Sequence, residues 1–320
     1  MRKIFALFIL SLTFVKCKND DAKEQALDIK KSVDLDLERF DIKYAQATAE
    51  TLPQLKKEYP FLFPSQFPDT LWTNKIKDKY FIELNQEVKK QFPNTTQLED
   101  DVEMLVSRIK HYFPEEKSPR VITLINEVLL DKKALYTNDF IFISLDCYLG
   151  SKHPFYDVFA EYQKQNLTKD QILPDLVTNF GFRKVVPSQD KTLLGEMIYF
   201  GKIQYLKDLL LPTTADNVKI GYTTTQYKWC QENEAQIWSY LIENKLLYDN
   251  NIKNYQRFIE EAPFTKFYEA IDKESPGRVG QWVGWQIVKS YMENNDTPVD
   301  KLLKMEPLEI FNNSKYKPKK

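Results

Sequence analysis

The amino-acid sequence predicts a mainly α-helical fold with one small β-sheet, an α+β class. The chain has 320 residues but only 8 glycines, whereas it holds 18 tyrosines and 21 phenylalanines. This composition favours few tight turns and a core rich in aromatic rings. Apolar residues recur at helical spacing along most of the chain, whereas short β-branched and aromatic runs gather between residues 120 and 149. The length suffices for a hydrophobic core without disulfide staples.

The N-terminal residues are typical of a bacterial lipoprotein export signal. A basic tripeptide, MRK, precedes an apolar run over residues 4–15, which is too short to span a hydrocarbon layer of roughly 30 Å. Cys17 follows this run, as the acylated cysteine of a lipobox does. We therefore expect residues 1–16 to be the signal peptide and Cys17 to carry a fatty acyl chain such as palmitate. Residues 17–25 are then a lipid anchor with a polar tether.

Two features leave alternatives open at this end of the chain. Lys16 stands where a lipobox usually has a small residue, and an ordinary signal peptide cleaved near Ala22 is the alternative. Acylation of Cys17 would leave Cys147 and Cys230, which we expect to be free thiols in the core because their neighbours are apolar. A disulfide between these two cysteines is the other outcome that an oxidising compartment allows.

Residues 26–313 are expected to form a single, predominantly helical domain. In its first part the apolar spacing predicts helix over residues 26–52, either as one piece or as two with an extended segment at 34–36, and helices over 71–92 and 95–113. Thr96 and Glu99 match a capping box at the start of the last of these. Four prolines between residues 51 and 69 exclude a long helix there and predict an apolar loop against the body, or an edge that binds a partner.

The predicted sheet has three short strands. They cover residues 121–125, 134–136 and 140–145, each rich in β-branched or aromatic side chains and separated by polar turns. The last of them is a continuous run, apolar except for Ser144, and is expected to be the most buried.

The second part of the domain is expected to be helical again, built around a central helix over residues 188–211 with Ser188 as its cap. The other predicted helices cover residues 155–164, 168–183, 224–247, 255–259 and 281–292. Gly280 and Gly284, one turn apart, would allow another helix to approach the last of these closely. Residues 314–320 form a basic tail that we expect to be loose.

Charge argues against nucleic acid as a partner. Cleavage before Cys17 removes three of the 45 basic residues and leaves 46 acidic ones, so the mature chain carries a net charge of −4. A nucleic-acid-binding protein ordinarily shows the opposite balance.

Several segments together resemble the gliding-motility lipoprotein B family (GldB) of gliding Bacteroidetes. They are LDCYLG at residues 145–150, GEMIYFGK at 195–202, KIGY at 219–222, Asn233-Glu234, APFTKF at 262–267, SPGRVGQWVGWQIV at 275–288 and SKYKP at 314–318. The resemblance implies a lipid-anchored envelope protein required for surface gliding, a process tied to type IX secretion. It implies other gliding and secretion proteins of the envelope as partners, with the outer membrane, facing the periplasm, as the favoured location and the inner membrane as the alternative.

The central helix also resembles the catalytic helix of gluzincin-type metallopeptidases. There the motif H-E-x-x-H places two imidazoles on one helix face for zinc, with the glutamate beside the metal-bound water. In this chain the segment Gly195-Glu196-Met197-Ile198-Tyr199 lacks both histidines, so we expect a zincin-like fold without the metal site. The two histidines of the chain lie elsewhere: His111 is expected on a helix surface and His153 in a turn.

We therefore expect no catalytic residues, no metal and no cofactor. Glu196 shares an apolar helix stripe with Tyr199, so ionisation there needs a partner, and we expect these two residues and Glu234 to form a polar pocket. The leading hypothesis is a non-catalytic envelope component. The alternatives are a divergent metallopeptidase-like hydrolase that uses the two glutamates, and a module that binds a peptide or glycan in the Glu196 pocket.

Overall fold

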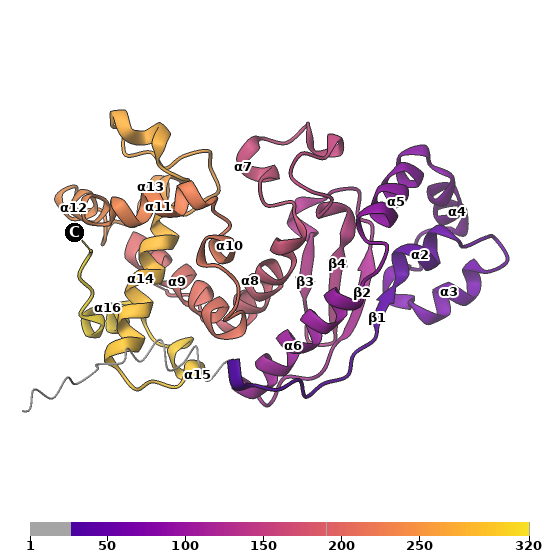
Figure 1. Cartoon of the computed structure of the whole chain (residues 1–320), viewed down its shortest axis with the longest axis horizontal. Helices are drawn as coiled ribbons and strands as arrows, with labels where there is room; N and C mark the ends of the chain where they lie inside the picture. The colour runs from indigo at the N-terminus through magenta and orange to yellow at the C-terminus, as the bar shows by residue number, and fades with distance from the viewer. Residues whose placement is uncertain (1–26, 190, 320) are drawn as a thin grey trace, which may run out of the picture.

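The computed structural model describes residues 27–189 and 191–319 (Figure 1). Helices dominate and one four-stranded sheet accompanies them, so the predicted α+β class is confirmed. The expected signal peptide, Cys17 and nearly all of the expected tether lie outside the described residues.

The sheet has the strand order β1-β2-β4-β3. Its strands are β1 (Leu37–Arg39), β2 (Arg120–Leu124), β3 (Ala134–Tyr136) and β4 (Phe140–Ser144). β1, β2 and β4 run parallel and β3 is antiparallel to β4. The three predicted strands are confirmed to within one residue at each end. β1 was not predicted, and the helix expected over residues 26–52 is wrong across this strand.

Helices cover both faces of the sheet. In the described first half they are α2 (Phe40–Ala45), α3 (Leu52–Glu58), α4 (Asp69–Lys77), α5 (Lys79–Gln91), α6 (Thr96–Tyr112), α7 (Glu161–Lys164) and α8 (Ile172–Lys184). Val121, Ile141 and Ile143 on one face belong to a core shared with α6 and α8, whereas Ile122 on the other face packs with α2 and α3. This division follows from the two-residue repeat of a strand.

Two helix boundaries in this half differ from the prediction. The helix expected over residues 71–92 is broken at Asp78, whose carboxylate accepts a hydrogen bond of 3.0 Å from the Phe81 N–H and so caps α5. The capping box of Thr96 is also absent, because the Asn94 side chain accepts from the Thr96 N–H instead.

The proline-rich segment, residues 51–69, packs against the body as predicted, but it contains a helix. Pro53 lies in the first turn of α3, where a missing N–H costs nothing because that donor has no partner within the helix. Tyr59 and Phe63 are buried with Phe40 in an aromatic cluster.

The described second half is almost wholly helical. Its helices are α9 (Leu193–Leu210), α10 (Asp216–Ile220), α11 (Thr224–Glu232), α12 (Glu234–Glu243), α13 (Ile252–Phe258), α14 (Val279–Asn294), α15 (Val299–Leu302) and α16 (Pro307–Ser314). The predicted central helix is confirmed, but Thr192 caps it rather than Ser188. The helix expected over residues 224–247 is two helices, separated at Asn233. The one expected over 155–164 is only the short α7 and a 3₁₀ turn.

α9 joins the two halves of the molecule. Ile203, Leu206 and Leu210 belong to the core under the sheet, whereas Met197 and Ile198 belong to a second core with α14. Figure 1 shows α9 between α8 and α14. Because α9 is apolar around most of its circumference, it can be buried on both sides at once.

The crossing of α9 and α14 depends on glycine, as the sequence predicted for Gly284. A Cβ atom added at Gly284 would lie 1.7 Å from the Met197 carbonyl oxygen, and one added at Gly201 would lie 2.3 Å from the Gly284 carbonyl oxygen. The two helix backbones are therefore in direct contact. Gly280 allows a second close approach, to the carbonyl oxygen of Phe258.

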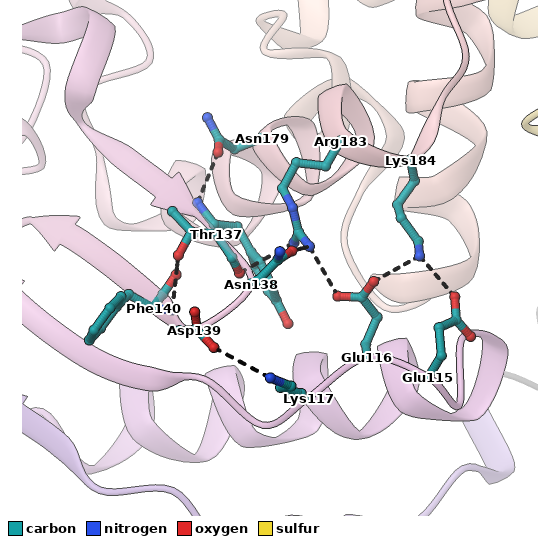
Figure 2. A network of polar contacts seen from close by, with 11 residues as sticks. Glu115, Glu116, Lys117, Thr137, Asn138, Asp139, Phe140, Asn179, Arg183 and Lys184 are labelled. Atoms are coloured by element: carbon teal, nitrogen blue, oxygen red, sulfur yellow. Dashed lines mark hydrogen bonds and ion pairs between the residues drawn. The ribbon is translucent and has the colours of Figure 1, made fainter.

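An ion-pair network fastens the end of α8 to the loop after α6 and to the β3–β4 turn (Figure 2). The Glu116 carboxylate, only 10% exposed, binds Arg183 at 3.3 Å and Lys184 at 2.7 Å. Arg183 also donates to the Asn138 side chain in the turn. This network ties three separate segments at one edge of the sheet.

Two further predictions are decided by the described residues. Cys147 and Cys230 are buried free thiols, as expected. The tail is not loose, because the Tyr316 ring packs on Trp238 and the chain end lies beside α12 (Figure 1). Across residues 27–189 and 191–319, each helix is too short or too polar to cross a membrane.

Candidate functional site

The predicted pocket residues lie in two separate places. Glu196 lies in the first turn of α9, where its 16% exposed carboxylate pairs with Lys191 at 3.4 Å. Tyr199 lies on the same helix, half-buried, and burial raises its pKa. Glu234 begins α12 and is buried, and its carboxylate accepts a 2.8 Å hydrogen bond from the Tyr316 hydroxyl. Within the described residues no hydrogen bond or ion pair joins Glu196 to Glu234.

The helix segment that resembles a metallopeptidase motif serves helix packing. The Gly195 N–H donates to the Thr192 hydroxyl in the cap, and the Met197 carbonyl contacts Gly284.

Among the described residues, the acidic ones of the predicted pocket do not form a metal site. Burial raises the pKa of Glu234, although its hydrogen bond from Tyr316 opposes that shift. In the part of the chain that the structure describes, no group of three or more histidine, cysteine or acidic side chains is placed to hold a metal ion.

Both histidines lie where the sequence placed them. His111 is exposed on α6, with its ring against Tyr112. His153 lies in a turn, where its Nδ1 accepts from the Phe155 N–H and its Nε2 lies 3.3 Å from the Glu87 carboxylate.

A polar cavity lies between α9, α10, α11 and α14, and the C-terminal segment forms part of its wall. We call it the α9–α14 cavity; its volume is about 430 Å³. The lining residues are Tyr205, Asp208, Leu209, Asp216, Lys219, Tyr227, Gln231, Glu234, Trp282, Gln286, Lys289, Ser290, Glu293, Tyr316, Lys317 and Lys319. Of the three predicted pocket residues, only Glu234 lines this cavity.

Two lysines and two aspartates form a closed charge cluster in the wall. The Lys219 ammonium, 1% exposed, lies 2.8 Å from Asp208 and 3.0 Å from Asp216. The Lys289 ammonium lies 3.6 Å from Asp208 and 3.2 Å from Asp216. Each cation therefore faces both anions, which offsets the cost of removing four charges from water.

The pKa values follow from these contacts. Burial by itself would lower the pKa of Lys219, but Asp208 and Asp216 outweigh it and raise that pKa above its ordinary value. Burial would raise the pKa of Asp216, yet Lys289 and Lys219 hold it down at about 2. Lys219 and Asp216 are thus both charged at neutral pH.

Aromatic groups complete the cluster. The Trp285 indole N–H donates to Asp208 at 2.7 Å, and the Lys289 ammonium lies 3.8 Å from the centre of the Trp285 ring. The Tyr227 hydroxyl donates to Asp216 at 3.2 Å. These bonds hold the carboxylates in one orientation.

A second buried lysine holds the backbone next to the cluster. Lys207 is buried on α9, and its ammonium donates to the Lys219 backbone carbonyl at 2.6 Å. Burial lowers the pKa of Lys207 to about 7, because the charged form loses its hydration. This contact fixes the end of α10, and with it the position of Lys219.

The comparisons with known proteins identify the chain by its family. The model of the family described as gliding motility protein GldB matches residues 20–318. The chain belongs to this family. No curated protein and no solved structure matches the chain.

Four of the seven segments that carry the resemblance to the GldB family contribute residues to the cavity. Lys219 comes from KIGY, Glu234 from Asn233-Glu234, Trp282 and Gln286 from the long segment over residues 275–288, and Tyr316 with Lys317 from SKYKP. These four segments are far apart in the sequence but share one wall. The segment over residues 195–202 instead makes the helix crossing.

Sequence reasoning missed the α9–α14 cavity. Its charged residues, such as Asp208 and Lys219, look like ordinary solvated positions in the sequence. The available signal was the set of family-like segments, four of which contribute residues to the cavity.

Proposed function

We propose that this GldB-family protein is a lipid-anchored component of the cell envelope that supports gliding motility through contact with other proteins. Membership of a gliding-motility family over residues 20–318 carries the proposal. The partners that we propose are other envelope proteins of the gliding and type IX secretion machinery. The favoured location is the periplasmic face of the outer membrane.

The anchor is supported by the sequence before the described body. An apolar run over residues 4–15 is followed closely by Cys17, and residues 18–24 are mostly polar, as a tether would be. A single acyl chain gives only marginal membrane binding, so a diacylated cysteine fits stable attachment better.

A non-catalytic role is supported by the residues of the metallopeptidase-like segment and by their part in helix packing. Gly195 and Tyr199 occupy the positions of the two histidines, and neither side chain replaces an imidazole as a zinc ligand. The same turns of α9 are committed to the contact with α14, and Glu196 is paired with Lys191.

Replacement of Cys17 by serine tests the anchor. We expect the variant to leave the membrane fraction and the cells to stop spreading, because a hydroxyl cannot be acylated through the lipoprotein pathway. Membrane fractionation and a spreading assay on agar measure both effects. Lys16→Ala is the matched control, since it brings the lipobox closer to the usual pattern and should leave attachment intact. Normal attachment and gliding of the Cys17→Ser cells would refute the anchor.

Replacement of Glu196 by glutamine tests the non-catalytic role. The change keeps the size of the side chain and removes the charge that a hydrolase would need, so we expect gliding to remain normal. Because the Lys191 partner is 62% exposed, the loss of stability should be below about 1 kcal/mol. A spreading assay with a thermal unfolding scan measures both. Loss of gliding with a folded protein would favour the hydrolase instead.

A further inference from the structure

We infer that the α9–α14 cavity binds a neutral, hydroxyl-rich ligand of the saccharide class. This goes beyond the proposed function, and it concerns a site other than the predicted Glu196 pocket. A volume of about 430 Å³ lies within the range of small-molecule sites, roughly 300–1,000 Å³.

The charges of the wall cancel one another. Asp208, Asp216, Glu234 and Glu293 face an equal number of lysines, namely Lys219, Lys289, Lys317 and Lys319. The two deepest cations are already shared by two carboxylates, at distances of 2.8–3.6 Å. A charged ligand would have to break these pairs, so an uncharged ligand is favoured.

Two side chains on different helices of the cavity wall, α11 and α14, offer hydrogen-bonding groups to a ligand. Gln231 is exposed on α11, and Gln286 on α14 donates to the carbonyl of Trp282 in its own helix across a long 3.4 Å. A ligand hydroxyl can replace such a weak contact, and each carboxamide offers both a donor and an acceptor. Carboxamides and oriented carboxylates together suit a ligand with several hydroxyl groups.

Aromatic rings provide the apolar surface of the cavity. Tyr227 and Tyr316 are half-buried and line the cavity, so each ring can lie against the C–H face of a sugar. The Trp282 side chain, only 1% exposed, adds a third aromatic group to the lining.

Binding can be measured on the full-length lipidated protein in a detergent without sugar groups. Maltose, chitobiose and mannobiose are the probes, whereas trialanine, a zwitterion, and inorganic phosphate, an anion, are the charged comparators. Tryptophan fluorescence and titration calorimetry report binding, since Trp282 lines the cavity. The test variant is Gln231→Ala with Gln286→Ala. Gln236→Ala is the matched control, because Gln236 is exposed on α12 away from the lining.

We expect saturable binding of at least one disaccharide, a loss of roughly tenfold or more in affinity for the double variant, and no change for the control. Gln231→Ala alone, at an exposed position, should lose roughly threefold and keeps the test valid should the double variant unfold. The inference is overturned when none of the disaccharides binds, when only a charged comparator binds, or when the variants bind as tightly as the wild type. Attachment to membranes and gliding of Cys17 variants are separate measurements, so failure here leaves the proposed function standing.

Discussion

Replacement of Gly284 by alanine is expected to lower the free energy of unfolding by about 3 kcal/mol or more. The new Cβ would lie 1.7 Å from the Met197 carbonyl oxygen, which belongs to the backbone of α9 and cannot move aside as a side chain can. α9 and α14 would have to separate, and both cores that α9 joins would loosen. Overpacking of a core ordinarily costs roughly 1–3 kcal/mol, and here the obstacle is rigid. Urea unfolding followed by circular dichroism measures the change.

Gly181→Ala is the matched control in a neighbouring helix. Its Cβ would lie 3.0 Å from the Ile203 side chain, a contact that a shift of a few tenths of an ångström relieves, and alanine favours a helix over glycine by about 1 kcal/mol. The net change should therefore stay within about 1 kcal/mol. An unfolding midpoint of Gly284→Ala equal to that of the wild type would show that the helices do not meet through this residue.

Replacement of Lys219 by methionine is expected to cost about 3–5 kcal/mol, because it leaves Asp208 and Asp216 with less compensation inside the protein. Lys219 is 1% exposed, so water cannot replace its ammonium group without opening the site. The free energy of unfolding in urea measures the loss. Lys289→Met is the control, and its cost should be smaller since Lys289 is 20% exposed. Equal stability of Lys219→Met and the wild type would contradict the proposed energetics.

The same cluster predicts a dependence on acid. The pKa of Asp216 is about 2 in the folded protein, below its ordinary value of 3.8. A carboxylate with a lowered pKa stabilises the fold fully above its unfolded value, and this contribution disappears as the pH falls toward 2. Asp216→Asn should therefore flatten the loss of stability of the wild type between pH 4 and pH 2. Parallel pH profiles of the two proteins would show that the cluster does not hold this carboxylate.

Local sequence predicted the elements whose signals are local. β2, β3 and β4 were found because β-branched and aromatic residues concentrate in them, and α9 because its apolar residues repeat at helical spacing. β1 was missed, since its three residues, Leu37-Glu38-Arg39, include no β-branched or aromatic side chain. Its existence depends on pairing with β2, in which Leu37 lies opposite Val121.

Helix breaks were the main errors of the prediction. Apolar residues recur at helical spacing on both sides of Asp78 and of Asn233, so the pattern predicts one helix in each place. In the structure Asp78 turns its side chain to the backbone of α5, and Asn233 separates α11 from α12. A capped break and a continuous helix differ little in free energy, so the packing of the flanking helices decides which of the two forms.

The predicted pocket also shows that local sequence patterns do not report contacts between distant segments. The position of Glu196 beside Tyr199 followed from helix geometry, and its partner Lys191 is five residues away. Glu234 instead meets Tyr316, which is 82 residues away in the chain. No periodicity reports a contact of that kind.

The sequence by itself determined the α+β class, the central helix, three of the four strands and the family to which the chain belongs, because these follow from residue types within a short window or from the whole string of residues. Tertiary structure alone decided that Lys219, Asp208, Asp216 and Lys289 neutralise one another and that the C-terminal segment closes the cavity beside them. The physical reason is that the strength of an ion pair depends on distance and burial in space, and the path of the backbone sets both.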